Sequence, residues 1–101
     1  MTSIQINIPE TELKAFCRKN HIRKLSLFGS SLSENFSEKS DVDVLVEFEP
    51  GHVPGLALIR IQEELSGILG GRHVDLVTPK FLNRHIRDKV LSQAVVQYAQ
   101  E

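Results

Sequence analysis

Two aspartates stand one residue apart at the start of an otherwise apolar segment. Asp41 and Asp43 open the stretch DVDVLVEFE, residues 41–49, whose β-branched residues predict a strand. Because side chains alternate along a strand, both carboxylates face the same side, about 7 Å apart. Like charges this close repel unless a cation lies between them, and one or two carboxylates plus substrate phosphates commonly hold Mg²⁺. The pair predicts a two-metal phosphoryl or nucleotidyl transfer site. The alternative is a solvated strand edge or turn.

A third carboxylate lies in a later predicted strand, residues 73–78. Asp75 stands at the centre of HVDLV, although aspartate is depleted in strands. A charge there is costly unless it is paired or binds a metal. If the two strands are neighbours, Asp75 joins the first two carboxylates as a third oxygen ligand. Otherwise we expect it to pair with a basic residue such as Arg72 or Arg60.

A Gly-Ser step ends the strand predicted for residues 24–29. Gly29 lets the backbone approach an anion closely, and a helix start after it presents free N–H groups to phosphate. The hydroxyl of Ser30 adds one more donor. The alternative is a plain strand-to-helix turn in which the serine caps the helix.

The remaining patterns predict helices and strands in alternation, which favours an α/β or α+β fold with helices packed on a mixed sheet. We expect one domain over residues 1–101, in which residues 1–8 form an arm or a strand. The other predicted elements are helices at 9–20, 56–69 and 79–93, the last opened by Thr78-Pro79, and a strand at 94–98. The predicted core includes Leu13, Phe16, Cys17, Leu58, Ile61, Leu65, Ile68 and Leu69.

Composition limits the possible partners and compartments. The 101 residues carry 12 basic and 13 acidic side chains, a formal net charge of -1, so we expect no direct nucleic-acid binding and no membrane surface. No apolar run is long enough for a membrane span, and the N-terminus lacks the pattern of a signal peptide. The single Cys17 cannot form an internal disulfide, which suits the cytoplasm.

The combined motif resembles that of the DNA polymerase β-like nucleotidyltransferase superfamily. That signature is Gly-Ser, about ten residues, Asp-x-Asp on a strand and a distal third acidic residue; here it reads Gly29-Ser30, Asp41, Asp43 and Asp75. The short length and the stretches LSLFGS and SDVDVLVEFE are similar to the minimal nucleotidyltransferase (MNT) group. These are single-domain proteins usually encoded beside a HEPN-domain partner. The resemblance extends over residues 9–98.

The resemblance implies a polymerase β-like palm and a role for each motif residue. Asp41 and Asp43 would hold two Mg²⁺ ions, and Asp75 would complete one metal site and help to activate the attacking hydroxyl. Gly29 and Ser30 would hold the β- and γ-phosphates of the nucleotide. The chemistry implied is in-line attack on the α-phosphorus with pyrophosphate as leaving group, driven by positioning and metal electrostatics.

The resemblance also implies a function and a partner. An MNT protein acts as an antitoxin that transfers AMP from ATP onto a tyrosine of a HEPN ribonuclease toxin, which implies a hetero-oligomer with that toxin. One alternative is a catalytically weak MNT that neutralises the toxin by binding alone. Another is a nucleotidyltransferase for a small-molecule hydroxyl, although such enzymes usually carry an additional acceptor-binding domain.

The loop after the Gly-Ser step departs from the MNT pattern. Ser33 stands where arginine is usual, and Glu34 where glycine is usual. Either Lys39, Arg72 or Lys80 supplies the missing positive charge, or Glu34 points to solvent, or nucleotide binding is weakened.

Several further side chains have two interpretations each. Glu47 and His73 either line the site or lie at the surface. The basic residues of the last predicted helix either contact a partner or RNA or form a solvated face: Arg84, Arg87 and Lys89. The apolar residues near it either bind a partner or pack in the core: Phe81, Leu82, Val95 and Tyr98.

Overall fold

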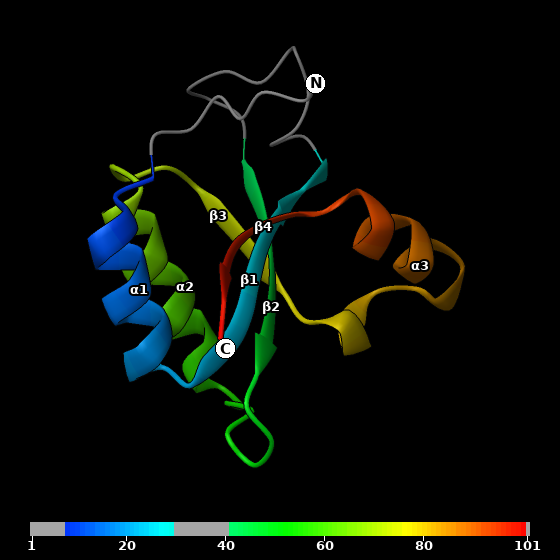
Figure 1. Cartoon of the computed structure of the whole chain (residues 1–101), viewed down its shortest axis with the longest axis horizontal. Coiled ribbons are helices and arrows are strands. Elements are labelled where there is room, and N and C mark those ends of the chain that lie inside the picture. Colours follow the sequence, from blue (N-terminus) through cyan, green and yellow to red (C-terminus); the bar gives the residue numbers. More distant parts are fainter. Residues whose placement is uncertain (1–7, 30–40, 101) are drawn as a thin grey trace.

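The described part of the chain forms a four-stranded mixed sheet with helices on both faces (Figure 1). The structure is a computed structural model and describes residues 8–29 and 41–100. Its elements are α1 (Glu10–Lys19), β1 (Ile22–Phe28), β2 (Val42–Phe48), α2 (Ala57–Ile68), β3 (Val74–Val77), the 3₁₀ turn η2 (Pro79–Phe81), α3 (Arg84–Gln93) and β4 (Val95–Ala99). The strand order is β3-β2-β1-β4; the β2–β3 pair is parallel, and the β1–β2 and β1–β4 pairs are antiparallel. The predicted mixed sheet with packed helices is confirmed.

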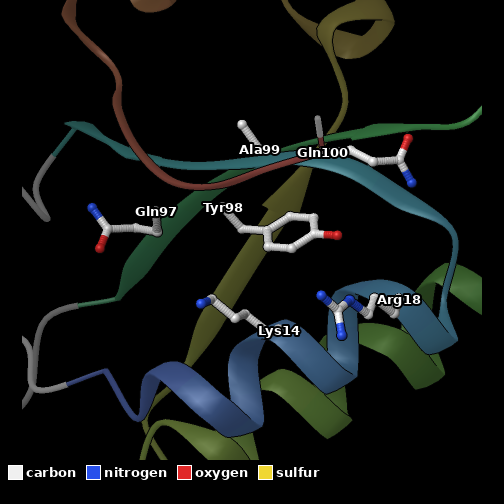
Figure 2. Close-up of a pocket in the computed structure, with 6 residues that line it drawn as sticks. All are labelled: Lys14, Arg18, Gln97, Tyr98, Ala99 and Gln100. Atoms are coloured by element: carbon white, nitrogen blue, oxygen red, sulfur yellow. The ribbon is translucent and has the colours of Figure 1, made fainter.

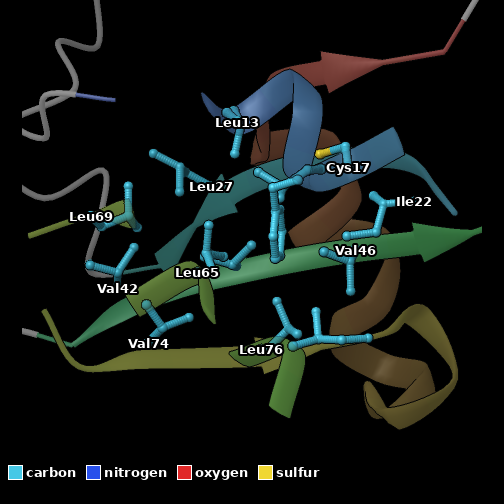
Figure 3. Packing of buried hydrophobic residues seen from close by; sticks show 14 of the residues in the cluster. Leu13, Cys17, Ile22, Leu27, Val42, Val46, Leu65, Leu69, Val74 and Leu76 are labelled. Carbon is cyan, nitrogen blue, oxygen red and sulfur yellow. The ribbon is translucent and has the colours of Figure 1, made fainter. Parts of the chain in front are cut away.

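The core lies between the sheet and the helices α1 and α2 (Figure 3). The predicted helix stripes are confirmed, because Leu13, Phe16 and Cys17 of α1 are buried, as are Ile61 and Leu65 of α2. Alternate residues of β2 complete the cluster: Val42, Val44, Val46 and Phe48. These side chains fix the direction of their neighbours, since the residues between them must face the other side of the sheet.

The other side of the sheet carries the acidic residues of β2 and lies toward η2 and α3 (Figure 1). Leu45 is buried there although it is not part of the main core cluster, so this face is partly covered as well. Asp43 and Glu47 flank Leu45 on the same face and are half-buried. The sheet therefore separates an apolar core on one side from a mixed polar face on the other.

The prediction of one continuous helix over residues 79–93 is wrong. The chain makes a short 3₁₀ turn, and Leu82 is then extended and buried before α3 begins. Thr78 makes no side-chain capping bond, whereas Oδ1 of Asn83 accepts a hydrogen bond from the N–H of His85 at 2.8 Å. Asparagine caps a helix strongly, so a second helix start inside the segment competed with the first.

Among the helices of residues 8–29 and 41–100, none has the length and apolar character that crossing a membrane requires.

Candidate functional site

The parallel pair of strands brings two of the predicted carboxylates side by side. Asp43 of β2 lies directly opposite Asp75 of β3, one step after the pair formed by Val42 and Val74. Residues opposite each other in a sheet point to the same face, so both carboxylates lie on the face turned away from α1 and α2. Like charges placed opposite each other destabilise a sheet. A cation held between the two carboxylates would offset this repulsion.

Gly29 packs directly against one of these carboxylates. It follows β1, whose last residue Phe28 lies opposite Asp43. A Cβ atom at Gly29 would lie 2.6 Å from Oδ2 and 3.3 Å from Cγ of Asp43, and the backbone there has a φ of +63°. Both the close contact and the left-handed backbone require glycine. Sequence reasoning expected this glycine to face a phosphate. In the structure it makes room for the carboxylate of Asp43, a reason that no sequence pattern reveals.

Asp41 lies at the same end of β2 but does not gather with the other two. It precedes the strand, and its Oδ1 lies 3.3 Å from Nδ1 of His73. Within residues 8–29 and 41–100, no group of three or more His, Cys, Asp or Glu side chains is gathered as ligands of a metal would be. The Asp41 side chain is 59% exposed, and an exposed contact of this kind contributes little.

The cations suggested for the triphosphate differ in position. Arg72 precedes β3 by two residues and lies at the end of the sheet where Asp43 and Asp75 pair. Its carbonyl oxygen accepts a hydrogen bond from the hydroxyl of Ser66, which ties this turn to α2. Lys80 follows β3 and lines a cavity of about 210 Å³ beside Glu47, toward the other end of β2. Of these two residues, Arg72 therefore lies at the better position to supply a positive charge beside Asp43 and Asp75. Lys39, Ser30, Ser33 and Glu34 lie outside the described residues.

A larger hollow lies elsewhere, between α1 and β4 (Figure 2). It measures about 430 Å³ and is lined by Lys14, Arg18, Gln97, Tyr98, Ala99 and Gln100. Tyr98 points toward α1 in Figure 2 and is partly buried against the core cluster. The carboxylates face the opposite side of the sheet, so this hollow is not their site.

Two polar contacts of the strands β2 and β3 were not predicted from the sequence. Oε1 of Gln62 accepts a hydrogen bond at 3.0 Å from the N–H of Leu76, the residue after Asp75. This bond holds the outer edge of β3 against α2. Glu47 lies on the face of Asp43 but pairs with Arg23 at 3.3 Å, which gives it a structural role. A glutamine on an amphipathic helix resembles any solvated residue, so no signal in the sequence could have found Gln62.

Comparisons with known proteins bear on what this arrangement does. A model of the nucleotidyltransferase domain family matches residues 10–98. Protein adenylyltransferase MntA of Thermococcus cleftensis is 40% identical over 75 residues, and the match covers 73% of this chain and 73% of that protein. A solved structure of a provisionally assigned minimal nucleotidyltransferase has a TM-score of 0.70 at 31% identity, covering 85% of this chain and 86% of that chain.

The fold also occurs in a solved toxin–antitoxin complex. That complex contains a tri-AMPylated HEPN toxin of Shewanella oneidensis and an MNT antitoxin. The TM-score is 0.64 at 22% identity, and the match covers 90% of this chain and 70% of the matched chain. The family model and the MntA relative together confirm the nucleotidyltransferase resemblance and the assignment as an enzyme. The chain therefore belongs to the nucleotidyltransferase domain family, as the spacing of its glycine and aspartates predicts.

Proposed function

We propose that this protein is a cytoplasmic antitoxin enzyme that transfers AMP from ATP to a tyrosine of a cognate HEPN ribonuclease toxin. The observation that carries the proposal is the register pair of Asp43 and Asp75, with Gly29 packed against the first carboxylate. The similarity to a protein adenylyltransferase supports AMP as the group transferred. The shared fold with an MNT antitoxin, found in complex with an AMPylated HEPN toxin, supports the choice of partner.

The donor set fits magnesium rather than a softer metal. Asp41, Asp43 and Asp75 offer only carboxylate oxygens, which are the ligands that Mg²⁺ prefers. In this proposal the three carboxylates hold Mg²⁺, which when bound neutralises charge that develops on the transferring phosphate. Two of them lie opposite each other on adjacent strands, and the proposal requires Asp41 to turn toward them.

The chain's own residues then position the nucleotide and the acceptor. The backbone of Gly29 and the hydroxyl of Ser30 hold the β- and γ-phosphates, so that the α-phosphorus lies in line with the incoming tyrosine oxygen. In the proposal, Asp75 helps to remove the proton of the tyrosine hydroxyl; it is the more exposed of the paired carboxylates. The tyrosine oxygen–phosphorus bond forms as the α–β anhydride bond breaks, and pyrophosphate leaves.

The test uses the purified protein and the HEPN protein encoded beside it. With Mg²⁺ and ATP labelled at the α-phosphate, we expect label on the HEPN protein and a mass increase of AMP on a tyrosine. ATP labelled at the γ-phosphate should leave no label. Asp43→Asn and Asp75→Asn should abolish transfer. Glu47→Gln is the matched control, because Glu47 shares the strand face of Asp43 but is held by Arg23.

The second candidate function is neutralisation by binding alone, and the observation that favours it is the replacement of the usual Arg-Gly by Ser33 and Glu34. One experiment distinguishes catalysis from neutralisation by binding alone. If the wild-type protein transfers no label while Asp43→Asn still protects cells from the toxin, the catalytic proposal is wrong and occlusion is the function.

A further inference from the structure

The helix α3 is poorly covered by the rest of the described protein. It spans ten residues, Arg84–Gln93, and none of them is buried. Isolated helices shorter than about 12 residues are marginal in water, so a helix of this length normally depends on packing of its apolar face. Ile86 and Leu91 are nevertheless 47% and 42% exposed. The Asn83 cap and the bond from Nη2 of Arg87 to the carbonyl of Leu82 hold the start of the helix in place.

Exposed apolar side chains continue on either side of this helix. Phe81 in the preceding turn η2 is 74% exposed, and Val96 in the following strand β4 is 46% exposed. Val96 lies opposite Ser26, which is not part of the core cluster, so it shares the sheet face that α3 lies over. We call Phe81, Ile86, Leu91 and Val96, together with α3 and η2, the α3 surface. It combines a regular helix with apolar side chains that the other described residues do not fully cover.

The α3 surface also carries a charge opposite to that of the whole chain. Residues 79–93 contain four basic side chains, Lys80, Arg84, Arg87 and Lys89, and one acidic side chain, Asp88. This segment is therefore formally +3, whereas the chain as a whole is -1. Basic side chains around apolar ones are complementary to an acidic protein surface with an apolar centre.

The α3 surface and the carboxylates of Asp43 and Asp75 lie on the same side of the sheet. This side is opposite α1 and α2 (Figure 1). After α3 the chain re-enters the sheet at Val95, which lies opposite Leu27 of β1. The next residue of β1, Phe28, lies opposite Asp43. A protein bound along α3 is thus brought to the end of the sheet that holds the candidate site.

We propose that the α3 surface is the docking site for the acceptor protein, which meets it with an acidic and apolar patch. The inference rests on the proposed function for the identity of the acceptor, the cognate HEPN protein, but it concerns binding and not catalysis. Docking supplies the orientation that places an acceptor hydroxyl before the carboxylates. It also completes the apolar packing that α3 lacks.

The test measures affinity for the HEPN protein without ATP, at two salt concentrations. Arg84→Glu/Lys89→Glu should weaken binding about tenfold or more and reduce its salt dependence, since both side chains are exposed. Ile86→Ser/Leu91→Ser should weaken binding at both salt concentrations. The matched control is Lys14→Glu/Arg18→Glu on α1, which changes the same charge on the opposite side of the sheet and should leave affinity within about twofold. Transfer assays on Arg84→Glu/Lys89→Glu should show a raised KM and an unchanged kcat.

Hydrogen exchange of the unmodified protein provides a readout that needs no variant. Amides of residues 84–93 should become protected when the HEPN protein is added. Unchanged exchange there, or equal losses of affinity in the α3 and α1 variants, would overturn the docking proposal even if AMP transfer is observed. Loss of binding to an RNA oligonucleotide, but not to the HEPN protein, in the α3 variants would overturn it in favour of RNA. Protection of α3 without any AMP transfer would support docking and contradict the proposed catalysis.

Discussion

Replacement of Gly29 by alanine tests whether the position of the Asp43 carboxylate governs activity. The new Cβ would lie 2.6 Å from Oδ2, and an ordinary contact begins near 3.4 Å, so the carboxylate must move by about 0.8 Å. Catalytic groups need placement within about 0.5 Å, and a misplacement of about 1 Å can cost about 100-fold in rate. We therefore expect Gly29→Ala to lower kcat for AMP transfer by about 10- to 100-fold.

The same substitution has a backbone cost that a second glycine isolates. Alanine at a φ of +63° costs about 1–2 kcal/mol. Gly51 has a φ of +82° but no atom within 4 Å of an added Cβ, so Gly51→Ala carries the backbone strain without the contact. Gly51→Ala should lose about this much stability and Gly29→Ala at least as much, with a Tm lower by about 4–8 °C for each kcal/mol lost. Only Gly29→Ala should lose activity.

The assay compares transfer rates of the two glycine variants over a range of Mg²⁺ concentrations. Gly29→Ala should require more Mg²⁺ for half-maximal rate, because the displaced carboxylate is one of the proposed ligands. If Gly29→Ala matches Gly51→Ala in rate and in Mg²⁺ dependence, the contact between Gly29 and Asp43 is not what positions the site, and the reasoning fails.

Three further predictions concern the carboxylate pair, the edge of β3 and the buried thiol. Asp75→Asn should raise the unfolding free energy by about 0.2–1 kcal/mol in metal-free urea titrations, because it removes a like charge opposite Asp43; a loss of stability would contradict this. Gln62→Ala leaves the N–H of Leu76 without its acceptor and should cost about 1 kcal/mol in the same titration, whereas Gln62→Glu, which keeps the acceptor, should cost less. Burial raises the pKa of the Cys17 thiol from its usual 9.0 to about 12, so as pH rises the thiol ionises in the unfolded chain before it ionises in the folded protein. The free energy of unfolding should therefore fall between pH 9 and pH 12, by up to about 1.4 kcal/mol per pH unit. A Cys17→Ala variant should lack this part of the slope, and an identical slope in the two proteins would refute the assignment.

The elements that bear the site could be predicted because their patterns are local. The alternation of β2 fixes which way Asp43 points, and the apolar stripes of α1 and α2 fix which side of the sheet is core. The pairing of Asp43 with Asp75 needs the strand order and register as well, and a single sequence does not contain them explicitly. Sequence reasoning could therefore only make the third carboxylate conditional on the two strands being neighbours.

The parts that sequence reasoning missed depend on contacts between distant residues. Gly29 fits its place because of a side chain 14 positions later, and Gln62 matters because of an amide 14 positions later. The break before α3 arose because Asn83 caps a helix better than Thr78 does, while Leu82 is buried between the two turns. Competing caps in one segment are hard to rank without knowing which residues the sheet covers.

The most direct test of the proposed chemistry is peptide mass spectrometry of the cognate HEPN protein after incubation with this protein, ATP and Mg²⁺. The proposed mechanism predicts AMP on a tyrosine with wild type and with Glu47→Gln, and none with Asp43→Asn or Asp75→Asn. Modification that persists at the wild-type rate in both aspartate variants, or that fails with wild type under conditions where the two proteins bind, would contradict it.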